Sequence, residues 1–253
     1  MRTALIGSTG FVGSNLAKQN KFSDEFHSSN VAQIKGEHYD VLVCSAAKGA
    51  KWMANKDPEG DRAHINELIN TLNKVTTDLF ILISTVDVYP CPREVDEDSD
   101  PHGPNHAYGV NRLFLEDFVR NSFKKHAIIR LPALFGDGLK KNAIYDLLHD
   151  NQIDLINPNS QFQFYDLTHL WSDINVVIKN DIPLMNFATQ PVQMLTVVNN
   201  FFPNKKIGIA AKNPVFYDVR TKYSEIFGKT GNYIYAESEI INGLGLFINK
   251  SSL

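Results

Sequence analysis

Short apolar runs alternate with helical patterns through the first half of the chain. The unbroken apolar character of the runs is typical of strands buried on both faces of a parallel sheet. They lie at Ala4–Ile6, Val41–Cys44, Leu79–Ile83 and Ala127–Leu131. Between them, apolar residues recur at helical spacing over Val12–Lys18, Ala63–Val75 and Ala107–Phe123. This alternation predicts an α/β fold with a doubly wound parallel sheet.

One connection in this pattern is unusually short. A second strand is expected near Glu25–Ser28, and the third begins near Tyr39. Only about ten residues separate the two strands, whereas a parallel crossover usually needs a dozen or more. We therefore expect the helix of this crossover to be a single turn or missing.

The regular pattern loosens after Leu131. Pro132, Gly136 and Gly138 interrupt it, and aromatic and asparagine-rich stretches follow. We expect one domain over residues 1–132 and a small C-terminal substrate lobe over 133–253, with segments near 162–200 returning to the sheet. A terminal helix is predicted to begin near Ala236.

Composition bears on whether the protein binds nucleic acid, a membrane or a metal. A net charge of −3 and a pI near 6.2 give no attraction to nucleic acid. No apolar run reaches the ~18 residues of a membrane span, and Gly7 comes too early for a signal peptide. The two cysteines show no CxxC spacing, and the histidine spacings suggest no metal site. A cytoplasmic protein without a membrane partner is expected.

A glycine-rich segment follows the first strand directly and leads into the first helix. Gly7 permits a tight turn, Gly10 lets the backbone approach a pyrophosphate, and Gly13 lets the helix pack close to the strand. The N-terminus of the helix then offers free N–H groups to the phosphates. The segment predicts a Rossmann-type fold that binds a dinucleotide.

The end of the second strand bears on the choice of dinucleotide. An acidic residue about 20 positions after the glycines usually holds the adenosine ribose of NAD. The sequence there is His27-Ser28-Ser29-Asn30, which has neither a carboxylate nor an arginine. NAD and NADP both stay open, and the small residue Ser28 gives a slight preference for NADP.

A hydroxyl, a phenol and a guanidinium form the candidate catalytic set. Thr85 lies at the carboxyl end of a predicted strand, where open α/β sheets bind ligands. Tyr108 and Arg112 are four positions apart in a predicted helix and therefore share one face. A catalytic tyrosine needs a nearby cation, because the reference pKa of a phenol is about 10. Tyr108 can then exchange a proton while Thr85 orients the substrate oxygen.

Further motifs extend this pattern along the chain. Ser84–Tyr89 has the form S-[ST]-x-x-V-Y, and Tyr108–Glu116 has the form YGxxKxxxE with Arg112 at the lysine position. Arg130–Gly136 is similar to R-x-x-x-x-Y-G, and Cys44–Ala47 forms a segment of small residues. Two further motifs are Asp57-Pro58 followed by Asn66, and Tyr165-Asp166-Leu167.

With these motifs the chain resembles the extended short-chain dehydrogenase/reductases, the NAD-dependent epimerase/dehydratase family, which acts mostly on nucleotide sugars. The resemblance is dense in the N-terminal half and loose in the C-terminal half. It implies Thr85, Tyr108 and Arg112 as catalytic residues and a nucleotide sugar as the substrate, and it leaves a homodimer open. The cofactor-binding residues it implies are Gly7, Thr9, Gly10, Phe11, Val12, Gly13, Ser28, Ser45, Ala46, Ala47, Tyr108, Arg112 and Pro132.

The chain departs from the family pattern at two positions. Arg112 stands where the family has lysine, and a planar guanidinium does not substitute simply for an ammonium. Val86 precedes Asp87, so the acidic pair of the dehydratases is incomplete. We therefore expect an NAD(P)-dependent reductase or epimerase. The alternatives are a nucleotide-sugar dehydratase and a non-catalytic NAD(P)-binding protein. Lys140, Lys141 and Arg220 are candidates for a diphosphate clamp by charge alone.

Overall fold

The computed structural model describes residues 1–211 and 213–251. The chain forms two compact units. The first consists of Met1–Pro90, Ser99–Arg130 and Thr168–Met185, and the second of Cys91–Asp98, Leu131–Leu167 and Asn186–Leu253. Each unit is therefore assembled from segments that are far apart in the sequence. None of the helices in the described ranges is long and apolar enough to cross a membrane.

The first unit is built on a six-stranded sheet with the order β10-β6-β4-β3-β1-β2. Strand β1 pairs in parallel with both β2 and β3, and β3 pairs in parallel with β4. These pairings confirm the predicted Rossmann-type α/β sheet. The strands are β1 (Thr3–Ile6), β2 (Asp24–Phe26), β3 (His38–Cys44), β4 (Thr76–Thr85), β6 (His126–Leu131) and β10 (Leu184–Asn186).

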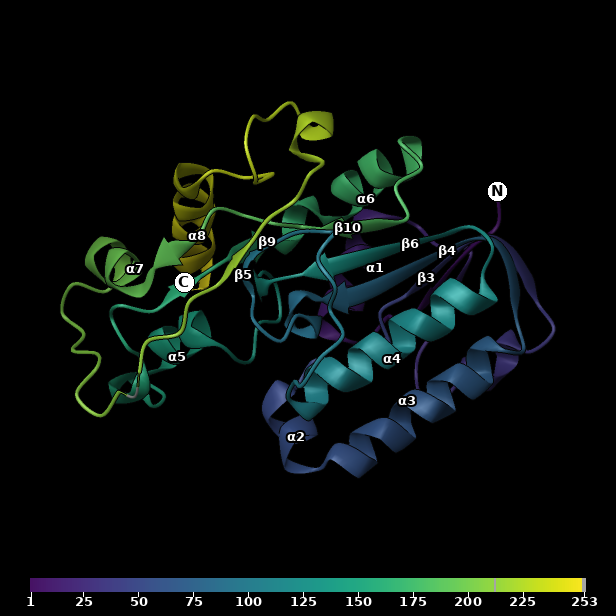
Figure 1. Cartoon of the computed structure of the whole chain (residues 1–253), viewed down its shortest axis with the longest axis horizontal. Helices are drawn as coiled ribbons and strands as arrows, with labels where there is room; N and C mark the ends of the chain where they lie inside the picture. The colour runs from purple at the N-terminus through teal and green to yellow at the C-terminus, as the bar shows by residue number, and fades with distance from the viewer. Residues whose placement is uncertain (212, 252–253) are drawn as a thin grey trace. The chain divides into compact units, whose positions relative to one another are not determined.

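Helices cover both faces of this sheet. Figure 1 shows α3 and α4 side by side across one face, and α1 on the opposite face with α6 beside it. Phe80 of the sheet stacks on Phe123 at the end of α4, with ring centroids 4.1 Å apart. The helices are α1 (Phe11–Gln19), α2 (Lys51–Lys56), α3 (Pro58–Leu72), α4 (Ala107–Ser122) and α6 (Leu170–Lys179).

The short connection between β2 and β3 is confirmed. It contains only the single-turn helix η1 (Val31–Ile34). Because β2 and β3 lie on opposite sides of β1, the direction of winding reverses at β1. Ligands of open α/β sheets bind outside the carboxyl end of such a switch point, which here is the end of β1 at Ile6.

Helix α3 begins at Pro58, before the predicted start at Ala63. The Asp57 side chain accepts a hydrogen bond from the Gly60 N–H and caps the helix, and Pro58 suits the first helical position. The apolar periodicity does not reveal this first turn, because Pro58–Asp61 contains no large apolar side chain at helical spacing. The earlier start brings Asp61 into the helix.

A buried ion pair ties α4 to the sheet. Glu116, fully buried on α4, accepts two hydrogen bonds from the Arg130 guanidinium of β6, at 3.0 and 2.7 Å. The Ser84 hydroxyl of β4 donates to the same carboxylate at 2.6 Å, and Arg120 binds it from the next turn of α4 at 2.7 Å. Since Ser84 is adjacent to Thr85, this cluster fixes the end of β4 relative to α4.

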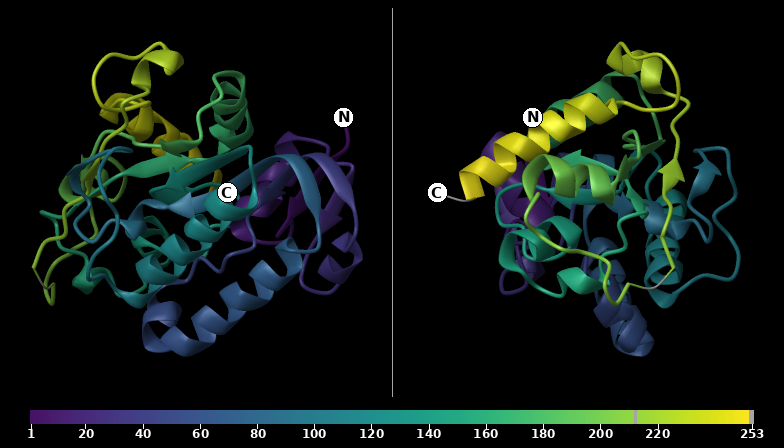
Figure 2. Two further views of the ribbon diagram at one scale, coloured as in Figure 1. Left: turned by 45° about the vertical axis from the view of Figure 1, so that its right-hand side comes forward. Right: turned by 90° about the vertical axis from the view of Figure 1, so that its left-hand side faces the viewer.

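The second unit has short strands around its own core, which includes Phe135, Phe164 and Leu244. Strands β7 and β9 pair in parallel, and α8, yellow in the right-hand view of Figure 2, packs on β9 and α7. The predicted terminal helix is therefore present. The elements are β5 (Arg93–Val95), β7 (Ala133–Phe135), α5 (Ala143–His149), β8 (Gln161–Phe162), β9 (Phe164–Asp166), β11 (Val192–Gln193), α7 (Met194–Phe201), β12 (Asp218–Val219) and α8 (Glu237–Ser251).

The Glu116→Ala variant tests the ion pair between α4 and the sheet. We expect it to lower the free energy of unfolding by about 3–5 kcal/mol, because the buried guanidinium of Arg130 loses its counter-charge. Urea denaturation measures the change. Asp117→Ala, which removes a half-exposed carboxylate from the same helix, is the matched control and should change stability by about 1 kcal/mol at most. Equal losses in both variants would contradict a special role for Glu116.

Candidate active site

The glycines of the loop between β1 and α1 differ in what surrounds them. A Cβ at Gly7, where φ is +91°, would lie 2.8 Å from the backbone N of Ala46. A Cβ at Gly13 would lie 2.0 Å from the Gly7 carbonyl oxygen. At Gly10, φ is −73° and the nearest atom to a Cβ would be 3.3 Å away. The chain itself therefore requires glycine at positions 7 and 13, whereas at position 10 a Cβ would make one close contact that a small shift relieves.

The N-terminus of α1 is open to an anion. Gly10 is its N-cap residue, with no side chain to bond the first N–H groups, and the first turn carries no acidic residue. These N–H groups have no acceptor within the helix. Phe11 and Val12, which begin the helix, are half-buried, and Thr9 is exposed beside them. The arrangement fits a pyrophosphate, because both the N–H groups and the helix dipole favour negative charge.

The segment after β3 lies against the glycine loop. The Ser45 hydroxyl donates to the Ile6 carbonyl at 3.1 Å, while Ala46 and Ala47 pack on the core of the unit. The next residue, Lys48, presents its backbone carbonyl to the Arg112 guanidinium. The structure thus brings the predicted glycine-loop residues and the Ser45–Ala47 segment together, and links them through Lys48 to α4.

The loop after β2 contains no charge that would select one dinucleotide. Ser28 is exposed, and Asn30 closes the loop by accepting from the His27 N–H at 2.7 Å and donating to the Glu25 carbonyl at 3.0 Å. Two carboxylates precede the loop within β2: Glu25 is exposed, and Asp24 is paired with Arg2 at 2.9 Å. Neither an acid for a ribose hydroxyl nor an arginine for a 2′-phosphate lies between His27 and Asn30.

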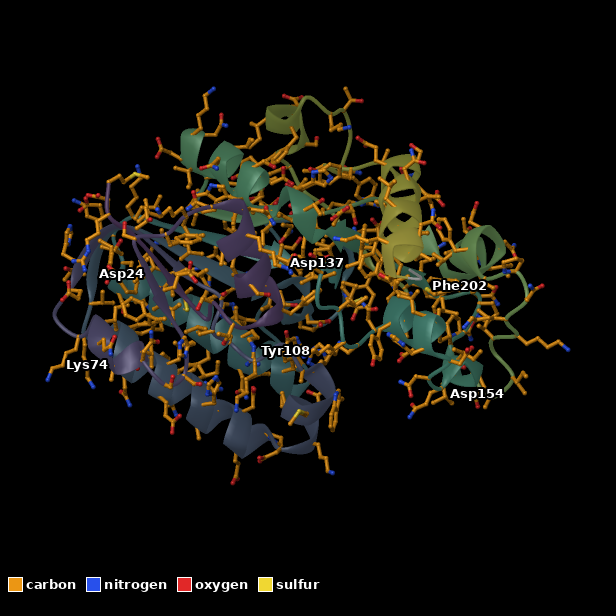
Figure 3. All side chains as sticks on the ribbon, turned by 180° about the vertical axis from the view of Figure 1, so that it is seen from behind. Asp24, Lys74, Tyr108, Asp137, Asp154 and Phe202 are labelled. Carbon is orange, nitrogen blue, oxygen red and sulfur yellow. The ribbon has the colours of Figure 1, made fainter. Side chains whose placement is uncertain are left out.

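Thr85, Tyr108 and Arg112 lie together in the first unit. Thr85 ends β4, and its side chain forms a hydrogen bond with that of Tyr108. The guanidinium carbon of Arg112 lies 4.5 Å from the centroid of the Tyr108 ring, as the i, i+4 spacing predicts. Figure 3 labels Tyr108 on α4. The site therefore joins a hydroxyl, a phenol and a cation at the carboxyl end of the sheet.

Three side chains that the sequence analysis did not select fix the first turn of α4. The ring Nδ1 of His106 accepts from the Gly109 N–H at 3.0 Å and caps the helix. Asn55 of α2 accepts from the Tyr108 N–H at 3.0 Å. Asn105 donates to the backbone carbonyls of Asp87 and Val88, at 3.0 and 3.1 Å, and thereby holds the turn that follows Thr85. Of these contacts, only an N-cap could have been guessed from local sequence.

Arg112 is buried in a bidentate ion pair. Its two terminal nitrogens donate to the Asp61 carboxylate of α3, at 2.9 and 3.0 Å. Burial opposes the ionisation of Asp61, but hydrogen bonds from Arg112 and Asn111 outweigh it and hold the pKa of this carboxyl below its usual value. The Arg112 Nε–H has no partner among the described residues.

The surroundings of Tyr108 keep its phenol protonated. Burial raises the pKa of Tyr108, and the charge of Arg112 and the hydrogen bond with Thr85 only partly offset this effect. The negative charge of Asp87 acts in the same direction as burial. Tyr108 is therefore suited to donate a proton to an oxygen that becomes negative during a reaction.

A second charged group borders the phenol. Asp87 pairs with Lys51 of α2 at 2.8 Å, and the His106 Nε2 lies 4.0 Å away. Burial, and after it the charge of Lys51, lowers the pKa of His106. A neutral His106 fits its role as N-cap, because its Nδ1 must then accept a hydrogen bond.

The structure gives less support to a binding role for the candidate residues outside the first unit. Pro132 is buried between β6 and β7, and its place beside a cofactor stays a sequence-based prediction. Arg220 pairs with both Glu94 and Asp218, at 2.7 and 2.9 Å, so its charge is already balanced, while Lys140 and Lys141 are exposed.

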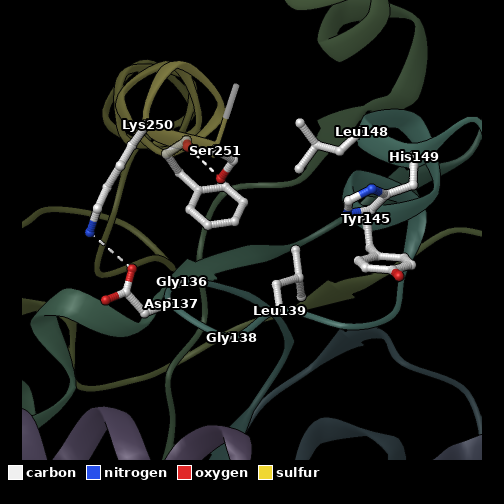
Figure 4. A pocket seen from close by; sticks show the side chains of 10 residues that line it. Gly136, Asp137, Gly138, Leu139, Tyr145, Leu148, His149, Lys250 and Ser251 are labelled. Carbon is white, nitrogen blue, oxygen red and sulfur yellow. Dashed lines mark hydrogen bonds and ion pairs between the residues drawn. The ribbon is translucent and has the colours of Figure 1, made fainter. Parts of the chain in front are cut away.

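A pocket of about 260 Å³ lies within the second unit. Figure 4 shows it between the Asp137–Lys250 ion pair and the rings of Tyr145 and His149. Thr85, Tyr108 and Arg112 are not among its lining residues. Within residues 1–211 and 213–251, no cluster of three or more histidine, cysteine or acidic side chains is arranged to hold a metal.

Fold and site together define a Rossmann-type α/β protein in which the N-terminus of α1 carries no side-chain cap and a threonine–tyrosine pair is buried. The family model of the RmlD substrate binding domain matches residues 1–152. The chain belongs to this family, and its resemblance to the extended short-chain dehydrogenase/reductases is confirmed. The comparison with curated proteins finds no match.

Solved structures of similar fold cover essentially the whole chain. MoeE5 in complex with UDP-glucuronic acid and NAD is 16% identical, with a TM-score of 0.77 and 100% of both chains covered. A dTDP-4-dehydrorhamnose reductase from Bacillus anthracis in complex with NADP is 16% identical, with a TM-score of 0.73 and 98% of both chains covered. The UDP-glucose 4-epimerase of Thermotoga maritima is 14% identical, with a TM-score of 0.72 and coverage of 100% of this chain and 99% of that one. At these identities the likeness establishes the fold.

The Gly10→Val variant tests the phosphate site. We expect it to fold as the parent does but to bind NADH and NADPH much more weakly, because the new side chain occupies the space above the open helix N-terminus. Fluorescence titration measures binding, and urea denaturation measures stability. Gly13→Val is the contrasting variant and should lose stability, since its Cβ would collide with the Gly7 carbonyl. Unchanged NADH and NADPH affinity in Gly10→Val would refute the placement.

Proposed function

We propose that this protein is an NAD(P)-dependent reductase or epimerase that acts on a nucleotide-activated sugar. The observation that carries the proposal is the contact between the Thr85 and Tyr108 side chains at the carboxyl end of β4. A buried, protonated phenol beside a hydroxyl and a cation is suited to proton exchange with a carbonyl or alcohol oxygen.

The residues around α1 fit the dinucleotide. Gly10 leaves the helix N-terminus open, and no acid in the first turn repels a pyrophosphate. When bound, the nicotinamide supplies or accepts the hydride. The uncharged loop after β2 is compatible with NAD and with NADP, and the small Ser28 keeps the slight preference for NADP. The solved proteins of similar fold include complexes with each of the two dinucleotides.

In the reductive direction, Tyr108 donates its phenolic proton to the sugar oxygen while the Thr85 hydroxyl orients that oxygen. The buried Arg112 charge stabilises the phenolate that remains, and the same guanidinium is the group proposed to hold the ribose of the cofactor. In an epimerase, Tyr108 would first accept the proton of the sugar hydroxyl and later return it to the same oxygen. The protein contributes orientation and electrostatics, and the cofactor carries the redox chemistry.

Support for a nucleotide sugar comes from the proteins of similar fold. Their names specify a reductase of a dTDP-sugar and an epimerase of UDP-glucose, and one of the structures contains UDP-glucuronic acid. The second unit, residues 133–253 in the main, would hold the sugar nucleotide. We also place the protein in the cytoplasm, where an exposed free thiol such as Cys91 stays reduced.

A dehydratase is the less favoured alternative. It would use Asp87 as an acid or a base, but the ion pair with Lys51 commits this carboxylate to holding the turn after β4. The position before it is the apolar Val86, so no second carboxyl group assists.

The Tyr108→Phe variant tests the proton donor. We expect turnover to fall by about 10²–10⁴-fold, while the affinities for NADH and NADPH stay almost unchanged. Because the folded pKa of Tyr108 is raised, the parent should keep its reductive activity across neutral pH and lose it only as the pH rises through that pKa. Steady-state rates on a panel of nucleotide sugars and their keto forms supply the measurement. Full turnover by Tyr108→Phe on a true substrate would exclude the assigned role.

Arg112 is tested by comparing the parent with Arg112→Lys and Arg112→Ala. Lysine keeps the charge, so most activity should remain, with the alkaline limb of the pH–rate profile displaced. Alanine should reduce turnover by about tenfold or more and weaken cofactor binding, since each pKa unit of lost charge stabilisation is about 1.4 kcal/mol. A non-catalytic dinucleotide-binding protein would show no turnover in any of the three forms. Equal turnover rates in the parent and in Arg112→Ala would mean that the positive charge of Arg112 does not contribute to catalysis.

A further inference from the structure

Resting on the proposed function, we propose that Asp61 is a positioning residue of this site: it holds the Arg112 guanidinium across the Tyr108 ring and sets how much of that charge the phenol feels. Its two carboxylate oxygens bind the two terminal nitrogens of Arg112, at 2.9 and 3.0 Å. The guanidinium carbon lies 4.5 Å from the Tyr108 ring centroid.

The ion pair is buried and fixed from several sides. The side chains of Arg112 and Asp61 are 3% and 6% exposed. Asn111 donates to Asp61 at 2.8 Å, and the Lys48 carbonyl accepts from Arg112. The Asp61→Asn variant keeps a side-chain carbonyl oxygen facing Arg112, and the Lys48 carbonyl still accepts from the guanidinium, so the variant removes the Asp61 charge while these polar contacts to Arg112 remain.

The net charge that acts on the phenol is the sum of several groups. Arg112 and His106 face it from α4, Asp87 from the turn after β4, and Lys51 from α2. From α3 come Asp61, paired with Arg112, and the neighbours of Asp61, His64 and Arg62. Asp87 is balanced by Lys51, and Asp61 balances Arg112. The phenol is therefore bordered by two nearly neutral pairs rather than by an isolated cation.

This balance explains why an arginine can stand at the lysine position. Only a planar fork can donate to both oxygens of Asp61 at once while its central carbon lies over the Tyr108 ring. An ammonium at position 112 would be drawn to Asp61 as a point charge, without that fixed geometry. Asp61 and Arg112 thus act as a unit. The effect of a substitution at either position on the phenol is therefore expected to depend on which residue stands at the other position.

The ionisation of Tyr108 itself provides the test and needs neither substrate nor turnover. A difluorotyrosine placed at position 108 alone has a more acidic phenol and a fluorine NMR signal that reports its titration. We expect Asp61→Asn to lower the pKa of this phenol by about one unit, because the Arg112 charge is no longer neutralised. In the proposed reductase, the alkaline limb of activity should move to lower pH by the same amount.

Two further variants keep the test decisive if Asp61→Asn does not fold. Arg112→Met leaves the Asp61 carboxylate unneutralised and should raise the pKa of the phenol. The double variant Asp61→Asn/Arg112→Met removes both charges and should return it close to the parent value. Glu67→Gln, which removes an exposed acid from the same helix, is the matched control and should leave the titration unchanged. Circular dichroism confirms that each variant is folded.

The outcomes separate this proposal from the proposed function. Opposite shifts in the two single variants, cancelled in the double variant, support the role of Asp61 even if no nucleotide sugar is turned over. Shifts of the same sign, or no shift in any folded variant, would overturn it even in an active enzyme. A shift in Glu67→Gln as large as that in Asp61→Asn would also overturn it, since any negative charge on α3 would then have the same effect.

Discussion

Helix α4 buries Tyr108, Arg112 and Glu116 on three successive turns of one face, and the first unit is organised around the partners of these three side chains. Tyr108 meets Thr85 at the end of β4, Arg112 meets Asp61 of α3, and Glu116 meets Arg130 of β6. A buried charge without a partner is far more costly than an apolar residue in the same place. Each contact therefore restricts where α4 can lie against the sheet, and together they set the distance between the phenol and the hydroxyl.

The sequence predicts those parts of the first unit that depend on a local pattern of residues. Apolar runs locate the strands of the sheet, and the spacing of Tyr108 and Arg112 places both on one helix face. The short link before β3 is also predictable, because chain length alone limits what fits there. The start of α3 is not predictable in this way, since its first turn carries no apolar periodicity.

The partners of the site residues are long-range contacts, and no local pattern reveals them. Asp61 precedes Arg112 by about fifty residues in the sequence, and a carboxylate in the first turns of a helix is ordinarily explained by the helix dipole. Asn55 and Lys51 come from a short helix that the apolar pattern does not predict. The residue types of the site could be recognised, but their pairing depends on how α2, α3 and α4 pack.

The six-stranded sheet has β2 at one of its two edges, because β3 pairs with the other side of β1. An edge strand exposes backbone N–H and C=O groups that can pair with a strand of another molecule and begin aggregation. Here the edge strand is only three residues long and begins with two acidic residues, Asp24 and Glu25, the first of which is paired with Arg2. Short length and charge make this edge a poor template for a foreign strand.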